Sequence, residues 1–314
     1  MEELAWYFPA ELEEIPQLLR KGCIIHSGGT NLLKGGLLRA GSSNDTDSTG
    51  TETRQAAGIA DISKISELKI FKHDNGKIII GSGLTYSETA ESMSGLNPEH
   101  ILVKALKNAA SNALRNRITL GGSVAAFPPW SDLAGPLIAL NADIYFITAD
   151  SPEEKTVTAE ELLKTPSRRK GIFITKIGFK NVPCKSWYYR DVRTRFDYPK
   201  FTITILAVRQ APGLSGAGEV GAGIPGVPGL AVNRHAVRIV ITGVKGRFVR
   251  EHALEEKARE LADGKIEIAE LKSLIDRGFT ARFQKKAETG GDYLRHVASV
   301  ELRRGLEKLI RSLK

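Results

Sequence analysis

Two short segments with paired glycines contain the residue types that a phosphate-binding site needs. The first, Ser27-Gly28-Gly29-Thr30-Asn31-Leu32, follows the apolar run Cys23 to Ile25. The second, Thr119-Leu120-Gly121-Gly122-Ser123, follows Ile118. Glycine allows close approach of a ligand to the backbone, and successive backbone N–H groups bind anions. One Gly-Gly pair indicates only a turn, but two such segments predict two walls of one diphosphate site.

The remaining residues favour chemistry supplied by a bound cofactor. Two cysteines in 314 residues are too few for an iron–sulfur cluster, and the six histidines lack the spacing of metal ligands. We therefore expect no metal site. A Gly-x-Gly-x-x-Gly pattern begins at Gly216, but Pro225 and Pro228 follow it where a dinucleotide-binding loop would begin a helix. No Gly-x-Ser-x-Gly nucleophile motif occurs.

Composition and charge narrow the class of protein. Hydrophobic residues make up 41% of the chain and charged residues 26%, as in ordinary globular proteins. No apolar run reaches the roughly 18 residues of a membrane span, and the N-terminus is acidic, so we expect a cytoplasmic protein. Residues 184–314 contain 25 Lys and Arg against 15 Asp and Glu. This basic half suits an acidic partner, whereas no motif for nucleic acid accompanies it.

Hydrophobic patterning predicts the elements that must position the two glycine segments. The Gly/Ser-rich tract 34–53 and the Gly/Pro-rich tract 211–230 are expected to be loops. Asn181-Val182-Pro183 is the expected boundary between domains 1–183 and 184–314. The first is predicted to be mixed α/β, and the second a sheet followed by helices. We expect strands at 23–25, 78–80, 143–148, 171–179, 201–208 and 236–242, and helices at 11–20, 85–93, 101–113, 133–140, 251–262, 267–276 and 293–313.

The chain resembles the FAD-binding subunits of the molybdenum hydroxylases, the group of xanthine dehydrogenase and carbon monoxide dehydrogenase. Their first loop reads Ala-Gly-Gly-Thr-Asp-Leu, and their second reads Ile-Arg-Asn-x-x-Thr-Leu-Gly-Gly-Asn, followed by Ser-Asp-Leu. Here the counterparts are residues 27–32, residues 114–123 and Ser131-Asp132-Leu133. Residues 80–86 and 189–195 match further. The resemblance implies an α+β fold. It consists of a two-part FAD-binding domain of the PCMH/vanillyl-alcohol-oxidase type, split near residues 55–60, and a smaller α+β C-terminal domain.

The resemblance also implies FAD as cofactor and a set of residues around it. Asp132 matches an acid near the adenosine end, Ile174 a further cofactor contact, and Arg190 a catalytic cation near the flavin ring. Asn31 and Ser123 depart from the family pattern, which has Asp and Asn at these positions. The diphosphate would lie between Ser27, Gly28, Gly29, Thr30, Asn31 and Leu32 on one side and Ile118, Thr119, Gly121, Gly122 and Ser123 on the other.

The function implied is electron transfer within a molybdenum hydroxylase. The FAD would take electrons from the [2Fe-2S] clusters of an iron–sulfur subunit and pass them to NAD⁺ or another acceptor, while a molybdopterin subunit oxidises the substrate. Two alternatives remain open. Gly223-Ile224-Pro225-Gly226 resembles a motif of the stand-alone FAD- and NADPH-dependent UDP-N-acetylenolpyruvoylglucosamine reductase, although here it follows the domain boundary. The basic half could instead belong to a non-enzymatic binding protein.

Overall fold

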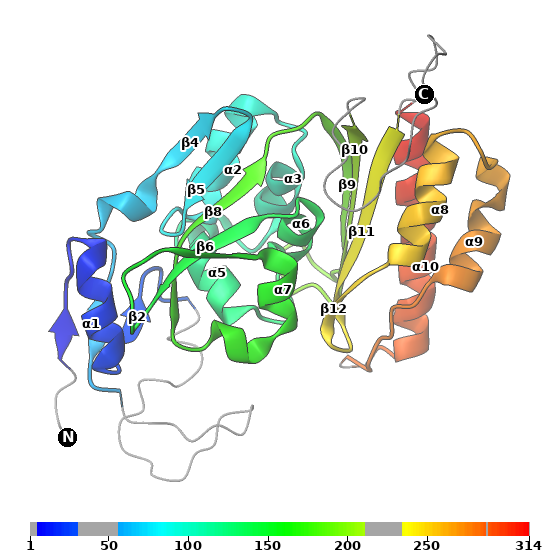
Figure 1. Cartoon of the computed structure of the whole chain (residues 1–314). Coiled ribbons are helices and arrows are strands. Elements are labelled where there is room, and N and C mark those ends of the chain that lie inside the picture. The colour runs from blue at the N-terminus through cyan, green and yellow to red at the C-terminus, as the bar shows by residue number, and fades with distance from the viewer. Residues whose placement is uncertain (1–4, 31–55, 211–233, 287, 314) are drawn as a thin grey trace.

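The computed structural model describes residues 5–30, 56–210, 234–286 and 288–313. The predicted α+β class is confirmed, because these residues form three separate sheets with helices packed around them. The first sheet is parallel, with strand order β1-β3-β2, and helix α1 (Ile15–Arg20) covers it at one end of the molecule (Figure 1). Its strands are β1 (Trp6–Tyr7), β2 (Ile24–His26) and β3 (Ile59–Asp61), and a short 3-10 helix, η1 (Leu12–Glu14), precedes α1.

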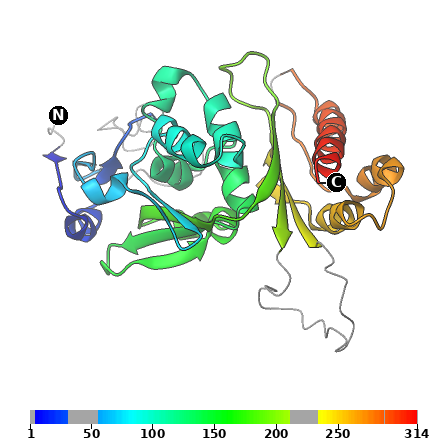
Figure 2. The ribbon, with the colours of Figure 1, turned by 90° about the horizontal axis from the view of Figure 1, so that it is seen from above.

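The second sheet is antiparallel and supports the helices that carry the second glycine motif. Its strand order is β4-β5-β8-β6-β7. Seen from above, the helices of residues 86–139 lie on one of its faces (Figure 2). The strands are β4 (Phe71–Asp74), β5 (Lys77–Gly81), β6 (Asp143–Thr148), β7 (Lys155–Thr158) and β8 (Ile172–Lys180). The helices are α2 (Tyr86–Leu96), α3 (Ile101–Asn108), α4 (Asn112–Arg115), α5 (Leu120–Ala126), α6 (Ala134–Ala139) and α7 (Ala159–Lys164), with η2 (Ser66–Lys69) and η3 (Pro166–Arg169) as 3-10 turns.

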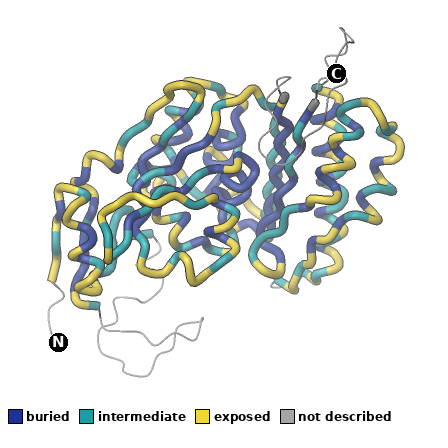
Figure 3. The backbone as a smooth tube through the Cα atoms, in the orientation of Figure 1, coloured by how far each residue is buried: buried dark blue, intermediate teal, exposed yellow. Residues whose placement is uncertain are grey.

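The third sheet, β12-β11-β10-β9, is buried on both faces. Leu206 and Val240 pack into the core of the second sheet's helices, while Ile205 and Ile239 pack against the C-terminal helices. Figures 1 and 3 show this sheet standing between the two groups of helices. Residues 181–183 connect β8 with β9 (Cys184–Arg190). The other elements are β10 (Thr202–Gln210), β11 (Arg234–Val244), β12 (Arg247–Arg250), α8 (His252–Ala262), η4 (Ile268–Glu270), α9 (Leu271–Gly278) and α10 (Gly291–Arg311).

Partly buried polar contacts join the third sheet to the preceding part of the chain. Arg250 bridges Glu160 of α7 and Glu255 of α8, at 3.0 Å and 2.9 Å. The Arg238 guanidinium donates to the carbonyl of Ala139 at the end of α6. These contacts join β11 and β12 to α6 and α7. No helix in the described residues is long and apolar enough to cross a membrane.

One expected helix differs from the structure. The helix expected over 101–113 ends at Asn108, because Ala110 adopts a left-handed φ of 46° and Ser111 begins a new helix as its N-cap. The split of the first domain near residues 55–60 remains a prediction; β3 begins at Ile59 and pairs with both β1 and β2. The loops predicted at 34–53 and 211–230 and the motifs at 216–221 and 223–226 lie outside the described residues.

A buried histidine at the start of α3 makes stability depend on pH. The Nδ1 atom of His100 accepts the backbone N–H of Leu102 as an N-cap, and burial lowers the pKa of His100 to about 4. The unfolded chain takes up this proton near pH 6.5 but the folded chain does not. We therefore expect the free energy of unfolding to fall by about 3 kcal/mol between roughly pH 6.5 and 4.

Denaturation in urea across this pH range tests the expectation. His100→Asn keeps a capping acceptor but cannot titrate in this range. The variant should therefore lose this part of the pH slope, whatever its stability at neutral pH. An equally steep slope in the variant would assign the effect to other groups.

Candidate cofactor site

One cavity of about 550 Å³ brings both glycine segments together. Its walls come from the end of β2, the segment from α4 to α6, the start of β8, and the end of β9 with the loop that follows it. Every predicted cofactor residue that the structure describes lines this cavity: Ser27, Gly28, Gly29, Thr30, Ile118, Thr119, Gly121, Gly122, Ser123, Asp132, Ile174 and Arg190. Asn31 and Leu32 lie outside the described residues. A volume of this size is that of a small-molecule pocket.

The first glycine segment is held against the second by contacts at Arg117. A Cβ on Gly28 would lie 1.5 Å from the Arg117 carbonyl oxygen, so only glycine fits there. In return, the Arg117 Nε donates to the Gly28 carbonyl at 3.1 Å. Gly29 has a φ of 72°, which other residues rarely adopt. Among the described residues, no group accepts a hydrogen bond from the backbone N–H of Gly28 or Gly29.

The second glycine pair is not the open loop predicted from the sequence. Gly121 and Gly122 lie in the first turn of α5, with Thr119 as its N-cap. The N–H of Gly121 donates to the Ser82 carbonyl, and that of Gly122 donates to the Thr119 hydroxyl. These donors are therefore not free to bind an anion, and the prediction of a second main-chain nest is wrong. The glycines instead allow close packing, since a Cβ on Gly121 would lie 2.7 Å from the Ser82 Cβ.

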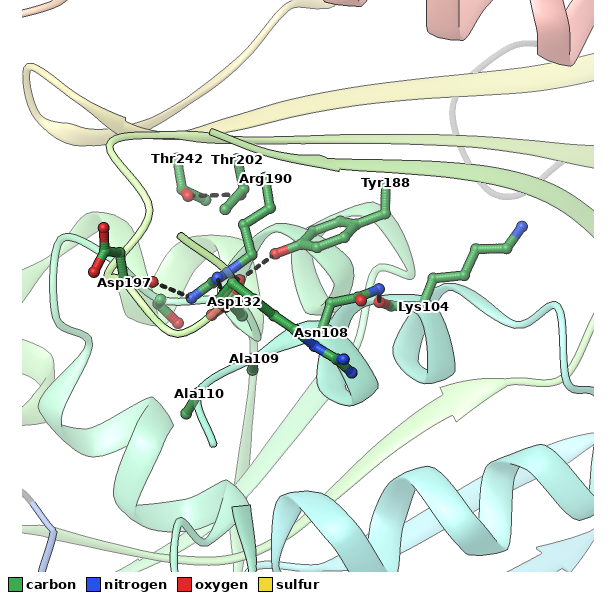
Figure 4. Close-up of polar contacts among 12 residues, drawn as sticks. Lys104, Asn108, Ala109, Ala110, Asp132, Tyr188, Arg190, Asp197, Thr202 and Thr242 are labelled. Carbon is green, nitrogen blue, oxygen red and sulfur yellow. Dashed lines mark hydrogen bonds and ion pairs between the residues drawn. The ribbon is translucent and has the colours of Figure 1, made fainter. Parts of the chain in front are cut away.

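Asp132 forms a buried polar cluster at the cavity wall with two residues of β9 (Figure 4). Its Oδ1 accepts the Tyr188 hydroxyl at 2.7 Å and the Arg190 Nε at 2.9 Å. Burial raises the pKa of Asp132, while Arg190 and Tyr188 lower it. Burial likewise raises the pKa of Tyr188, so its phenol stays a donor. Both hydrogen bonds of Asp132 use Oδ1.

Asp132 and Arg190 are in contact with each other. The resemblance implies that Asp132 lies near the adenosine end of the cofactor and Arg190 near the flavin ring, and these two roles remain predictions. The Arg190 guanidinium uses three of its five N–H groups within the protein, because Nη1 and Nη2 donate to the carbonyls of Arg195 and Asp197 and Nε donates to Asp132. These three bonds hold the side chain in place.

Sequence reasoning missed several residues of the same cavity. His26 lies beside Gly29, and the buried Tyr86 lies next to the second motif. Trp130, Phe196 and Tyr198 form an aromatic part of the lining, with the Trp130 and Tyr198 ring centroids 4.7 Å apart. The one sequence signal for Trp130 is its position directly before the Ser-Asp-Leu motif. No group of three or more possible metal ligands occurs among the described residues.

The chain belongs to the family of FAD-binding domains in molybdopterin dehydrogenases, whose sequence pattern matches residues 2–179. The family resemblance drawn from the motifs is thereby confirmed. The protein is an oxidoreductase component, and its cofactor is FAD. The glyceraldehyde dehydrogenase medium chain of Sulfolobus acidocaldarius is 26% identical. That match covers 47% of this chain and only about half, 53%, of the relative.

Solved structures share the fold over nearly the whole chain. A chain of quinoline 2-oxidoreductase from Pseudomonas putida 86 aligns with a TM-score of 0.76, at 19% identity, over 99% of this chain and 98% of that one. A chain of the carbon monoxide dehydrogenase of Hydrogenophaga pseudoflava aligns with a TM-score of 0.75, also at 19% identity and with the same coverage. At this level of identity the likeness shows the fold alone.

Proposed function

We propose that this chain is the FAD-carrying electron-transfer subunit of a multi-subunit molybdenum hydroxylase in the cytoplasm. It works with an iron–sulfur subunit, which supplies electrons, and a molybdopterin subunit, which oxidises the organic substrate. The electrons leave to NAD⁺ or another acceptor. One observation carries the assignment of the site: the cavity gathers every described residue that the family resemblance placed at FAD.

The residues of the cavity fit this cofactor. Gly28 and Gly29 form a cradle without side chains, in which their N–H groups donate to the diphosphate. The carboxylate of Asp132 lines the cavity and accepts a hydroxyl of the sugar or ribityl chain. Bound FAD supplies the redox chemistry, as a two-electron carrier that can exchange single electrons with clusters. The protein binds and orients it, and the aromatic lining limits its access to water.

The small number of cysteines supports the need for partner chains. Two cysteines cannot supply the four ligands of a [2Fe-2S] cluster, so the clusters belong to another polypeptide. The excess of Lys and Arg in residues 184–314 suits docking to an acidic surface.

Purification of the tagged chain from its native host tests this function. We expect partner chains to be retained together with flavin absorbance, iron and molybdenum, and substrate oxidation only by the assembled complex. The isolated chain loaded with FAD should oxidise no organic substrate. Turnover by that chain alone, or recovery of the chain without iron and molybdenum, would contradict the proposal.

A further inference from the structure

The loop that follows β9 spans residues 191–201 and contributes Phe196 and Tyr198 to the cavity lining, and these residues are 63% and 55% exposed. The backbone N–H of Asp191 donates to the Phe201 carbonyl and the Lys200 N–H donates to the Asp191 carbonyl, which closes the base of the loop. In the middle of the loop, the Tyr198 ring packs against Trp130, with centroids 4.7 Å apart, and the backbone N–H of Thr194 donates to the Asp197 carboxylate.

Arg190 adds two further contacts to the middle of the loop from a buried position. Its Nη1 donates to the Arg195 carbonyl at 3.1 Å, and its Nη2 donates to the Asp197 carbonyl at 2.7 Å. These two carbonyls bracket Phe196. The Arg190 side chain is only 8% exposed. Its contacts with the two carbonyls therefore depend on the planar, forked shape of the guanidinium and not on its positive charge alone. Figure 4 shows Arg190 lying between Asp132 and Asp197.

Asp132 and Tyr188 hold Arg190 in turn. The Asp132 carboxylate fixes its Nε at 2.9 Å, and Tyr188 donates to the same oxygen. Tyr188 and Arg190 are two positions apart on β9 and therefore point to the same face of the third sheet. Tyr188 itself does not line the cavity. The loop of residues 191–201 is thus held by a cluster of three side chains from two parts of the chain: Asp132, Tyr188 and Arg190.

We propose that Arg190 is a positioning residue that fixes the loop of residues 191–201 over the cavity, and that Tyr188 and Asp132 hold Arg190 in place for this task. Its action on the cofactor is indirect, through the placement of Phe196 and Tyr198. The importance of the loop for the cofactor rests on the proposed function, because the proposed function assigns the cavity to FAD. The contacts themselves involve protein groups only, so they can be tested without cofactor.

Arg190→Lys separates this role from that of a flavin-facing cation. Lysine keeps the positive charge and can pair with Asp132, but one ammonium cannot reproduce the fork to both carbonyls. Hydrogen exchange by mass spectrometry, on the FAD-free chain, should show the peptide of residues 191–201 exchanging about tenfold faster or more. Exchange in the β10 peptide of residues 202–210 should not change. With FAD bound, the flavin reduction potential should stay at the wild-type value.

Tyr188→Phe provides a second variant in which Arg190 is intact. It removes one bond to Asp132, so faster exchange in residues 191–201 is expected, by about threefold. The matched control is Tyr145→Phe, whose hydroxyl contacts Lys77 far from this cluster and should leave the loop unchanged. Wild-type loop exchange in Arg190→Lys would overturn the proposal, as would a shifted flavin potential with an unchanged loop. Failure of every form to bind FAD would instead contradict the proposed function and leave the exchange result standing.

Discussion

Replacing Gly28 with alanine is expected to lower the affinity for FAD by on the order of 100-fold. The added Cβ would lie 1.5 Å from a backbone oxygen of Arg117, and backbone cannot rotate away as a side chain can. The loop of residues 27–30 must therefore move away from the backbone at Arg117, and displacements of about 1 Å commonly have effects of this size. Titration of the FAD-free chain, followed by quenching of flavin fluorescence, measures the change.

Gly95→Ala is the matched control for this substitution. A Cβ at Gly95, inside α2, would meet nothing within 4 Å. Alanine there should leave FAD affinity unchanged and stabilise the fold by about 0.5–1 kcal/mol. Equal FAD affinity in Gly28→Ala and wild type would show that the first glycine segment does not shape the binding site.

Asp132→Ala is expected to reduce the free energy of unfolding by about 3–5 kcal/mol. Arg190 and Asp132 have side chains only 8% and 7% exposed, so removal of the carboxylate leaves a buried guanidinium without its counter-ion. The Tyr188 hydroxyl also loses its acceptor. Denaturation in urea at neutral pH measures the loss, and FAD affinity should fall with it because a carboxylate that lines the cavity is removed.

Asp143→Ala is the control for this prediction. Its carboxylate pairs with Lys77 at 3.3 Å, but both side chains are more than one third exposed. Such pairs contribute about 0–1 kcal/mol because water screens them. A loss in Asp132→Ala no greater than that in Asp143→Ala would mean that the buried cluster adds little to stability.

The sequence predicted which residues come together at one cavity better than it predicted the local backbone. Pairs of glycines stand out because no other residue permits such close approach, and Gly28 and Gly121 both make contacts that exclude a side chain. The order of the motifs along the chain then identified the family. The confirmed α+β fold follows from the same patterning, with β5, β8 and β10 at or near their expected positions. The division into domains 1–183 and 184–314 remains a prediction.

What the sequence did not reveal depends on contacts between distant segments. The helix break after Asn108 contains no Gly or Pro; Arg115 stabilises it by donating to the carbonyls of Ala109 and Ala110. Nothing in the sequence shows that the backbone N–H groups of Gly121 and Gly122 donate to Ser82 and Thr119. Likewise, Asp132 and Arg190 are 58 positions apart, so their ion pair has no local signature.

The central claim, that this cavity binds FAD, is tested most directly by measuring how much FAD the chain takes up. The FAD-free chain should bind one FAD per polypeptide, with quenching of flavin fluorescence and a structured visible absorption band. Gly28→Ala should fail to saturate at the same concentrations. Absence of stoichiometric uptake by the folded wild-type chain, or equal uptake by both proteins, would contradict the assignment of the cavity.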